Sequence, residues 1–167
     1  VIEPRAVSAS VRYKRILLEK TGRLDVDVVF GPLILEKPLA DATEDATRLA
    51  GEDILHRFRL TFDQRTRRIR MIPDSAEPIR SEPLRGIGIA FLPKKAGLEV
   101  AHIFPGTPGA ASEIRKGDLL VEVDGTPVYE RDDCSPAIPR EADSVVLSFV
   151  RDGESISVEI AVVDLVP

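Results

Sequence analysis

The chain has 167 residues, of which 43% are hydrophobic and 31% charged, and its formal net charge is −5. This balance is typical of a folded globular protein and excludes a disordered or fibrous chain. The length fits one ordinary domain or two small ones. One cysteine and two histidines allow no internal disulfide and disfavour a structural zinc site, so we expect no metal and no cofactor.

Membrane and nucleic-acid functions are also disfavoured. The apolar runs are too short to span a bilayer, and no basic segment followed by an apolar stretch signals export. Residues 79–167 carry 9 Lys and Arg against 15 Asp and Glu, and this acidic balance argues against nucleic acid as a partner. The first residue is Val1 rather than Met, so we expect a processed product or a piece of a longer protein.

The first half of the chain is predicted to be mainly β. Alternating or clustered apolar residues predict strands over Val11–Leu18, Leu24–Leu35, Phe58–Phe62 and Arg67–Ile72. Between them, Gly51–Phe58 predicts one helical turn with its apolar residues on one face. The segment Asp41–Asp45 lacks the spacing of a calcium loop, so we interpret it as a solvated loop.

Six arginines lie around the predicted hairpin at residues 57–72. They are Arg57, Arg59, Arg65, Arg67, Arg68 and Arg70. Alternation within paired strands favours a solvated hairpin face over a nucleic-acid patch, because no stacking aromatic residues are interleaved with them. The stretch Pro73–Pro78 then holds two prolines, small residues and acids, which is typical of a linker. We therefore predict two domains, residues 1–74 and residues 79–167.

The second half begins with a glycine-alternating loop, Arg85-Gly86-Ile87-Gly88-Ile89, and a short helix is predicted to open at Thr107-Pro108-Gly109. Tight turns are predicted at Asp124-Gly125 and Asp152-Gly153. Strands are expected over Ile87–Leu92, Leu98–Ile103, Leu119–Val123, Val145–Val150 and Ser155–Val162.

This order of loop, helix and turns resembles a PDZ domain, a fold that binds peptides by pairing them to a sheet edge. The resemblance implies that the loop N–H groups bind a C-terminal carboxylate, that the following strand pairs with the ligand, and that Arg85 adds charge nearby. The candidate peptide-binding residues are Arg85, Gly86, Ile87, Gly88, Ile89, Ala90 and Phe91. The expected partners are peptides or protein C-termini.

The second wall of such a groove is normally a long helix. Here that region is Tyr129–Arg140, and Pro136 and Pro139 cannot both lie inside one helix. We expect one helical turn or an irregular loop, and a groove that is shallow, closed or altered. Cys134 has no histidine in a partner-like context and is not expected to be a nucleophile, and His102 is expected to face outward from a strand.

The segment Gly51–Pro73 resembles the C-terminal end of a retropepsin-like aspartic peptidase domain. The match rests on Gly51, Asp53, Ile54, Leu55, Arg57, Phe58, Asp63 and Pro73. Bacterial proteins that join such a domain to a C-terminal PDZ module form a family. The resemblance implies a partial β-barrel before the PDZ-like module, with Asp53 and Asp63 in structural positions.

The catalytic machinery of that family is missing. An aspartic peptidase needs two carboxylates that share a proton, each in an Asp-Thr-Gly or Asp-Ser-Gly turn, and neither tripeptide occurs in the chain. Asp74-Ser75-Ala76 lacks the glycine, so no catalytic residue is assigned. We expect a catalytically inert fragment whose parent is an aspartic endopeptidase.

Two other functions are compatible with the residues. One is a non-enzymatic adaptor that binds chain ends, and the other is a module of a trypsin-like heat-shock protease, for which no triad is visible. A partial barrel leaves unpaired sheet edges, so we expect self-association through residues 1–74 as a symmetric dimer. Proteins of this architecture are often exported, for example to the periplasm, but no residue here identifies the compartment.

Overall fold

The structure is a computed structural model that describes residues 5–12, 15–31, 33–42, 55–75, 77–128 and 138–167. The prediction of a mainly β protein is confirmed, because the described residues form many strands and only the short helix α2 has defined bounds. Their sheets do not close into a barrel. No described helix has the length and apolar character needed to cross a membrane.

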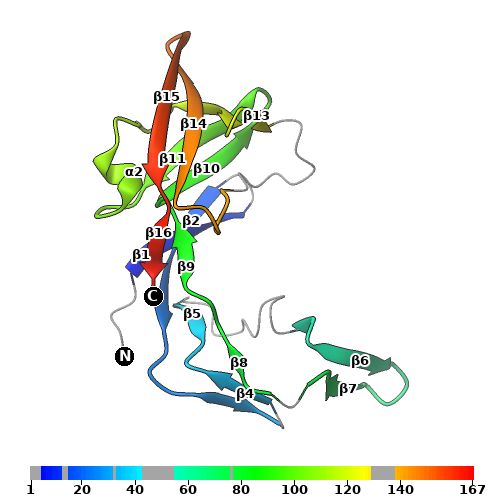
Figure 1. Ribbon diagram of the computed structural model, residues 1–167. Helices are drawn as coiled ribbons and strands as arrows, with labels where there is room; N and C mark the ends of the chain where they lie inside the picture. The colour runs from blue at the N-terminus through cyan, green and yellow to red at the C-terminus, as the bar shows by residue number, and fades with distance from the viewer. Residues whose placement is uncertain (1–4, 13–14, 32, 43–54, 76, 129–137) are drawn as a thin grey trace.

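The strands of the first half form three small sheets (Figure 1). These strands are β1 (Arg5–Arg12), β2 (Arg15–Arg23), β3 (Val28–Phe30), β4 (Leu33–Glu36), β5 (Leu39–Ala42), β6 (Phe58–Asp63), β7 (Arg68–Pro73) and β8 (Ile79–Arg80). One sheet has the order β1-β2-β5 and another the order β3-β4-β8, while β6 and β7 form a hairpin by themselves. Within the second sheet β8 pairs parallel to β4, so the first two residues of the predicted second domain, 79–167, form a strand that is paired with the first half.

Two strand predictions in the first half are wrong. Val11–Leu18 is not one strand, since Val11 lies on β1, which ends at Arg12, and pairs with Ile16 on β2. Leu24–Leu35 is also divided, because β3 ends before Gly31, whose φ of 61° is in the left-handed region. A strand cannot continue through that conformation.

The second half is built around a six-stranded antiparallel sheet of order β10-β11-β12-β14-β15, with β13 paired to β12. The elements are β9 (Leu84–Gly86), β10 (Ile89–Lys94), β11 (Gly97–Ile103), α2 (Pro108–Ala111), β12 (Leu119–Val123), β13 (Thr126–Pro127), β14 (Ser144–Arg151), β15 (Glu154–Ala161) and β16 (Val163–Val166). Strands β9 and β16 form a separate two-stranded ribbon that runs from this sheet toward the first half (Figure 1). The five strands predicted for this half are all present; Leu119–Val123 has the predicted bounds, and the other four have shifted ends.

The core of the second half follows from alternation along its strands. On β14, Val145, Leu147 and Phe149 are fully buried while the residues between them are more exposed, as a strand with one face on a core requires. Leu120 and Val123 of β12 lie in the same cluster. The two predicted Asp-Gly turns are confirmed: Asp124, Gly125, Asp152 and Gly153 all have positive φ, as a type I′ turn needs.

A buried ion pair holds the start of β12 to the end of β14. Asp118 is 3% exposed and accepts hydrogen bonds from Arg151 Nε and Nη2, each 2.7 Å long. It also accepts a 2.7 Å bond from the backbone N–H of Arg115. Arg151 Nη2 donates in addition to the carbonyl of Glu113, so both charged groups are satisfied.

The two halves contact one another through the side chain of Arg23. Arg23, at the end of β2, donates from Nε to the Pro167 carbonyl at 2.6 Å and from Nη1 to the Lys37 carbonyl at 2.9 Å. A longer 3.4 Å bond runs from Nη2 to the Glu82 carbonyl. This side chain therefore ties the C-terminal strand to the first half.

Candidate peptide-binding site

The glycine loop connects the ribbon strand β9 to β10, the first strand of the large sheet. Its carbonyls are held from the α2 side: the Ile87 carbonyl accepts a 2.8 Å bond from Gly109 N–H, and the Gly88 carbonyl accepts a 2.9 Å bond from Phe104 N–H. By contrast, no described residue accepts a hydrogen bond from the N–H of Ile87 or Gly88 outside the strand ladders. Adjacent unpaired N–H groups beside a residue at positive φ are suited to bind an anion.

Two glycines allow the loop and α2 to pack this closely. A Cβ at Gly88, where φ is +75°, would lie 2.1 Å from Thr107 Oγ1. A Cβ at Gly109 would lie 2.5 Å from Ile89 Cγ1. Any side chain at either position would push the loop off the helix, which explains why glycine occupies both.

Thr107 is a site residue that sequence reasoning missed. It is buried, and its Oγ1 donates a 2.7 Å bond to the Phe104 carbonyl. Its side chain fills the space that Gly88 leaves open. The sequence marked Thr107 only as the start of a helix, and no pattern in the chain links it to a glycine 19 residues earlier.

Strand β10 has one partner strand in the described part of the chain. It pairs with β11 and lies at the end of the sheet order, so no described strand pairs with its other edge. The register shifts between Ala90 and Phe91, and both residues are buried. A bulge at this point explains why two successive residues face inward. Ala90 and Phe91 would therefore contact a ligand through their backbone groups rather than through their side chains.

Arg85 is engaged by groups of its own chain. Its Nη1 donates to the Arg140 carbonyl at 2.8 Å and its Nη2 to the Val162 carbonyl at 2.9 Å. Nε lies 3.2 Å from Asp164 Oδ1, and the more distant Asp143 carboxylate is 3.9 Å from Nη2. The guanidinium thus links β9, β16 and the segment after residue 138, and its contact with a peptide carboxylate stays a prediction.

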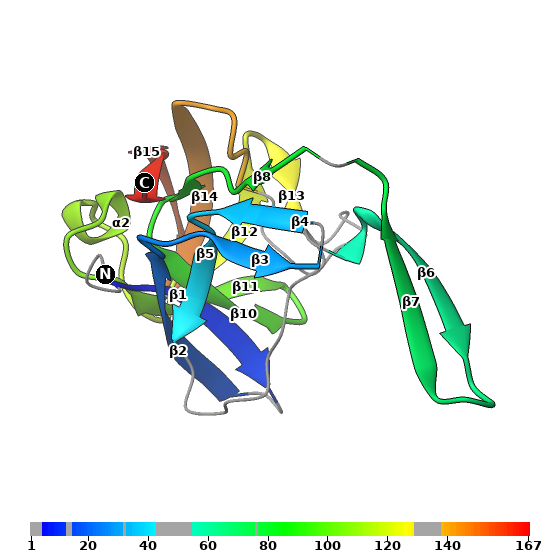
Figure 2. The same ribbon diagram turned by 90° about the horizontal axis from the view of Figure 1, so that it is seen from below.

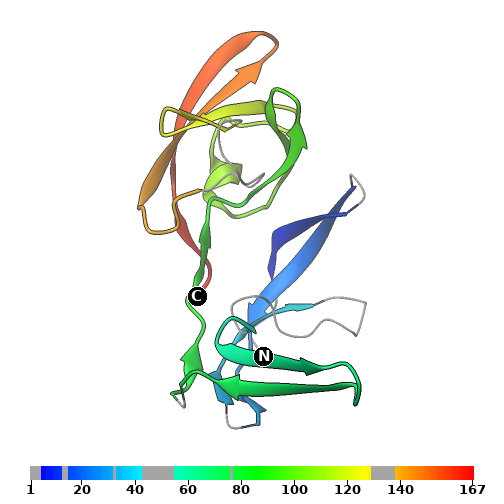
Figure 3. The same ribbon diagram turned by 90° about the vertical axis from the view of Figure 1, so that its right-hand side faces the viewer.

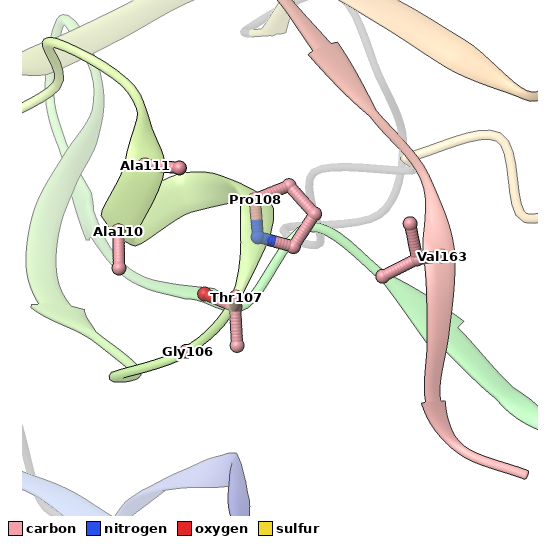
Figure 4. A pocket seen from close by; sticks show the side chains of 6 residues that line it. All are labelled: Gly106, Thr107, Pro108, Ala110, Ala111 and Val163. Carbon is pink, nitrogen blue, oxygen red and sulfur yellow. The ribbon is translucent and has the colours of Figure 1, made fainter.

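An open hollow lies next to the loop, on the side of α2. It has a volume of about 600 Å³, and Figure 4 shows Pro108 on α2 facing Val163 on β16 across it. The side chains around it are small and mainly apolar. The lining residues are Gly106, Thr107, Pro108, Ala110, Ala111 and Val163.

Most of the predicted second wall, Tyr129–Arg140, including Pro136 and Cys134, falls in residues 129–137, outside the described residues. The residues on either side of this range are defined: Val128 is buried, and Ile138 packs on the same core cluster. The prediction of a short or irregular wall is therefore untested.

The other residues considered from the sequence have structural surroundings. Asp63 caps the hairpin turn, with Oδ1 accepting from Arg65 N–H at 3.0 Å and Oδ2 from Thr66 Oγ1 at 2.6 Å. The Thr66 hydroxyl is the main reason that the pKa of Asp63 is lowered. His102 lies edge-on to Phe104 with ring centres 4.8 Å apart. Asp53 lies outside the described residues.

No metal centre is visible in the part of the chain that the structure describes, where no group of three or more potential ligands is assembled.

Comparison with known proteins agrees with this geometry. Residues 86–162 match the family model of the PDZ domain, a stretch that runs from the glycine loop through β15. The resemblance to a PDZ domain is thus confirmed for this part of the chain.

A second comparison matches part of the chain to a protein that is named as a protease. Over 40 residues, or 24% of its length, the chain is 46% identical to the "Putative serine protease HhoA" of Synechocystis sp. strain PCC 6803. The match covers 10% of that relative, so the chain spans only a small part of its length. The assignment of residues 1–74 to a retropepsin-like domain stays a prediction.

Proposed function

We propose that the second half of the chain binds the C-terminal end of an extended peptide. The ligand carboxylate accepts hydrogen bonds from Ile87 and Gly88 N–H, and its backbone pairs with the uncovered edge of β10. The observation that carries this proposal is the pair of N–H groups without a described acceptor at the end of that open edge. The match of residues 86–162 to the PDZ domain supports it.

We propose further that this module serves an aspartic endopeptidase, whose catalytic groups lie outside these 167 residues because neither Asp-Thr-Gly nor Asp-Ser-Gly occurs in them. The Gly51–Pro73 pattern supports this assignment. So does the β6–β7 hairpin, because the pattern predicts a hairpin at that place. The role of the module would be to select or position substrates.

A serine protease is a second candidate for the parent, favoured by the matched relative. The sequence upstream of Val1 in the gene discriminates between the two. An Asp-Thr-Gly or Asp-Ser-Gly turn there supports the aspartic class, whereas a Ser-His-Asp set supports the serine class. Finding neither would favour a non-enzymatic adaptor.

The binding proposal is tested by titrating the purified chain with fluorescent peptides that differ only in a free or amidated C-terminus. We expect amidation to weaken binding at least about tenfold, because a charge-assisted hydrogen bond contributes about 1.5–3 kcal/mol. Equal affinity for the two peptides would show that the loop does not bind a carboxylate.

The chain offers a matched pair of loop variants. Gly88→Ala places a methyl group against Thr107. Its control is Gly125→Ala, because Gly125 has the same φ of +75° and open space around it. Both variants strain the backbone alike, so only Gly88→Ala should abolish binding of the free-acid peptide. Circular dichroism establishes that each variant is folded, and a similar loss of binding in both would contradict the proposal.

A further inference from the structure

The hairpin β6–β7 has two chemically different faces. Residues directly opposite one another in an antiparallel pair lie on the same face. The pairs Phe58–Pro73, Leu60–Met71 and Phe62–Ile69 therefore give one apolar face. The alternate pairs put three arginines, Arg59, Arg68 and Arg70, on the opposite face, together with Thr61, Asp63 and Ile72.

The apolar face is covered only at its base. Phe58 is buried in a small cluster with Leu33 and Leu35, against which Leu60 and Met71 pack. Toward the turn, Phe62 is 64% exposed and Ile69 is 59% exposed. Figures 1 and 2 show the reason, since the hairpin extends as an arm away from the other sheets. Figure 3 shows the same arm from the side.

The arm also carries an excess of positive charge. Residues 58–73 contain five arginines, the three on the polar face together with Arg65 and Arg67, and one acid, Asp63. The Asp63 carboxylate is occupied by the turn. None of the five arginines forms an ion pair with another described residue.

Both edges of the arm are open in the described part of the chain, because β6 and β7 pair only with one another. The β7 edge presents Ile69 and Met71 on the apolar face and Arg68 and Arg70 on the polar face. The β6 edge ends in Asp63, which would repel an acidic partner. An added strand would alternate its side chains between the two faces, as every strand does.

We propose that the β7 edge of this arm is a docking site for an extended segment of another protein in which apolar residues alternate with Asp or Glu. The apolar residues of that segment cover Ile69 and Met71, and its acids pair with Arg68 and Arg70. Charge complementarity between the arginines of the arm and the acids of the segment favours this partner over a second copy of the chain or a lipid surface. A second copy docked arm to arm would bring like charges together, and a flat lipid surface reaches only one of two opposite faces.

The proposal is independent of the peptide-carboxylate site, and the test keeps the two apart. The probe is a fluorescent Glu-Val-Glu-Val-Glu-Val peptide capped at both ends, so that it has no free carboxyl terminus for the glycine loop. Its binding to the full chain is measured by anisotropy beside a capped Glu-Glu-Glu-Val-Val-Val peptide. We expect the alternating peptide to bind at least about tenfold more tightly.

Variants of arm residues test whether the alternating peptide binds to the arm. The double variant Arg68→Glu/Arg70→Glu and the single variant Phe62→Ser should each weaken binding at least about tenfold. All three residues are exposed, so the fold tolerates the changes. The matched controls Lys95→Glu/Lys116→Glu and Val146→Ser alter exposed residues elsewhere and should leave the affinity unchanged. Gly88→Ala should also leave it unchanged.

No binding of the alternating peptide, equal binding of the block peptide, or equal losses in the control variants would each overturn the proposal. So would a concentration-dependent dimer by light scattering that Phe62→Ser abolishes. The last would identify a second copy as the occupant. Binding of anionic phosphatidylserine vesicles that depends on Phe62 would instead identify a lipid surface and equally refute it.

Discussion

The ion pair between Asp118 and Arg151 gives the sharpest test of how the second half is stabilised. Asp118→Asn keeps the size of the side chain but removes its charge and one of its two acceptor oxygens. The amide that replaces this oxygen is a donor, and it would face the Arg151 guanidinium in either orientation, and in one of them the Arg115 N–H as well. At least one donor is then left without an acceptor in a buried place.

The expected magnitude follows from the geometry. Each bond to the charged carboxylate contributes about 1.5–3 kcal/mol, and removing one partner of a buried pair costs about 3–5 kcal/mol. Because the Arg151 side chain is one-fifth exposed and regains water, we expect a loss of about 3 kcal/mol in the free energy of unfolding. For a unit of this size that lowers Tm by roughly 10–20 °C.

The loss of stability in Asp118→Asn should depend on pH in a defined direction. The Arg151 guanidinium and, more weakly, the Arg115 N–H hold the pKa of Asp118 below its ordinary value of 3.8, against the opposing effect of burial. A carboxylate with a lowered folded-state pKa stabilises the fold above its unfolded pKa, and this contribution is lost as the pH falls through the folded pKa. The difference between the wild type and Asp118→Asn should therefore be constant near neutrality and shrink below about pH 4.

The assay is urea unfolding followed by circular dichroism at a series of pH values. Asp143→Asn serves as the control, because that exposed carboxylate lies 3.9 Å from Arg85 and should change stability by less than about 0.5 kcal/mol. A loss below about 1 kcal/mol for Asp118→Asn, or a loss that stays the same from neutral pH to pH 3, would refute the reasoning.

Three further predictions concern the core, the arm and the loop. Phe149→Ala should destabilise the second half by about 3–5 kcal/mol in urea unfolding, since the ring is fully buried; a change below about 1 kcal/mol would place Phe149 outside the core. Asp63→Ala should speed amide hydrogen exchange in the β6–β7 hairpin but not in β14–β15, because the turn loses its acceptor; unchanged exchange would deny Asp63 that role. Arg85→Met should weaken binding of the free-acid and amidated peptides by the same factor, as expected of a residue that positions the loop; a selective loss for the free acid would make it a direct ligand.

Local sequence signals were enough to predict most of the second half. The alternation on β14 and β15 and the turn at Asp152-Gly153 are short-range features, and the hairpin follows from them. The failure at Val11–Leu18 has the same origin, since its central residues include no glycine, proline or asparagine to signal a turn. At Gly31 the glycine itself is a turn signal, but the apolar residues on both sides of it favoured the prediction of one continuous strand.

The candidate site could be predicted only in part. The glycine loop is visible in the sequence because positive φ and close backbone approach demand glycine. The contact of Gly88 with Thr107 and the bonds of Arg85 to Arg140 and Val162 join segments far apart in the chain. No periodicity records such contacts, so the bonds of Arg85 to its own chain could not be predicted from the sequence.

The parallel pairing of β8 with β4 has a mechanical consequence. Leu35 pairs with Ile79, and Arg80 forms an ion pair with Glu36, so the chain is anchored to the first half immediately before it enters β9. Only Ser81–Pro83 separate the two strands, a reach of roughly 10 Å when fully extended. The PDZ module is therefore joined to the first half by a short segment, so a peptide that bound at Gly88, as proposed, would be kept close to the first half.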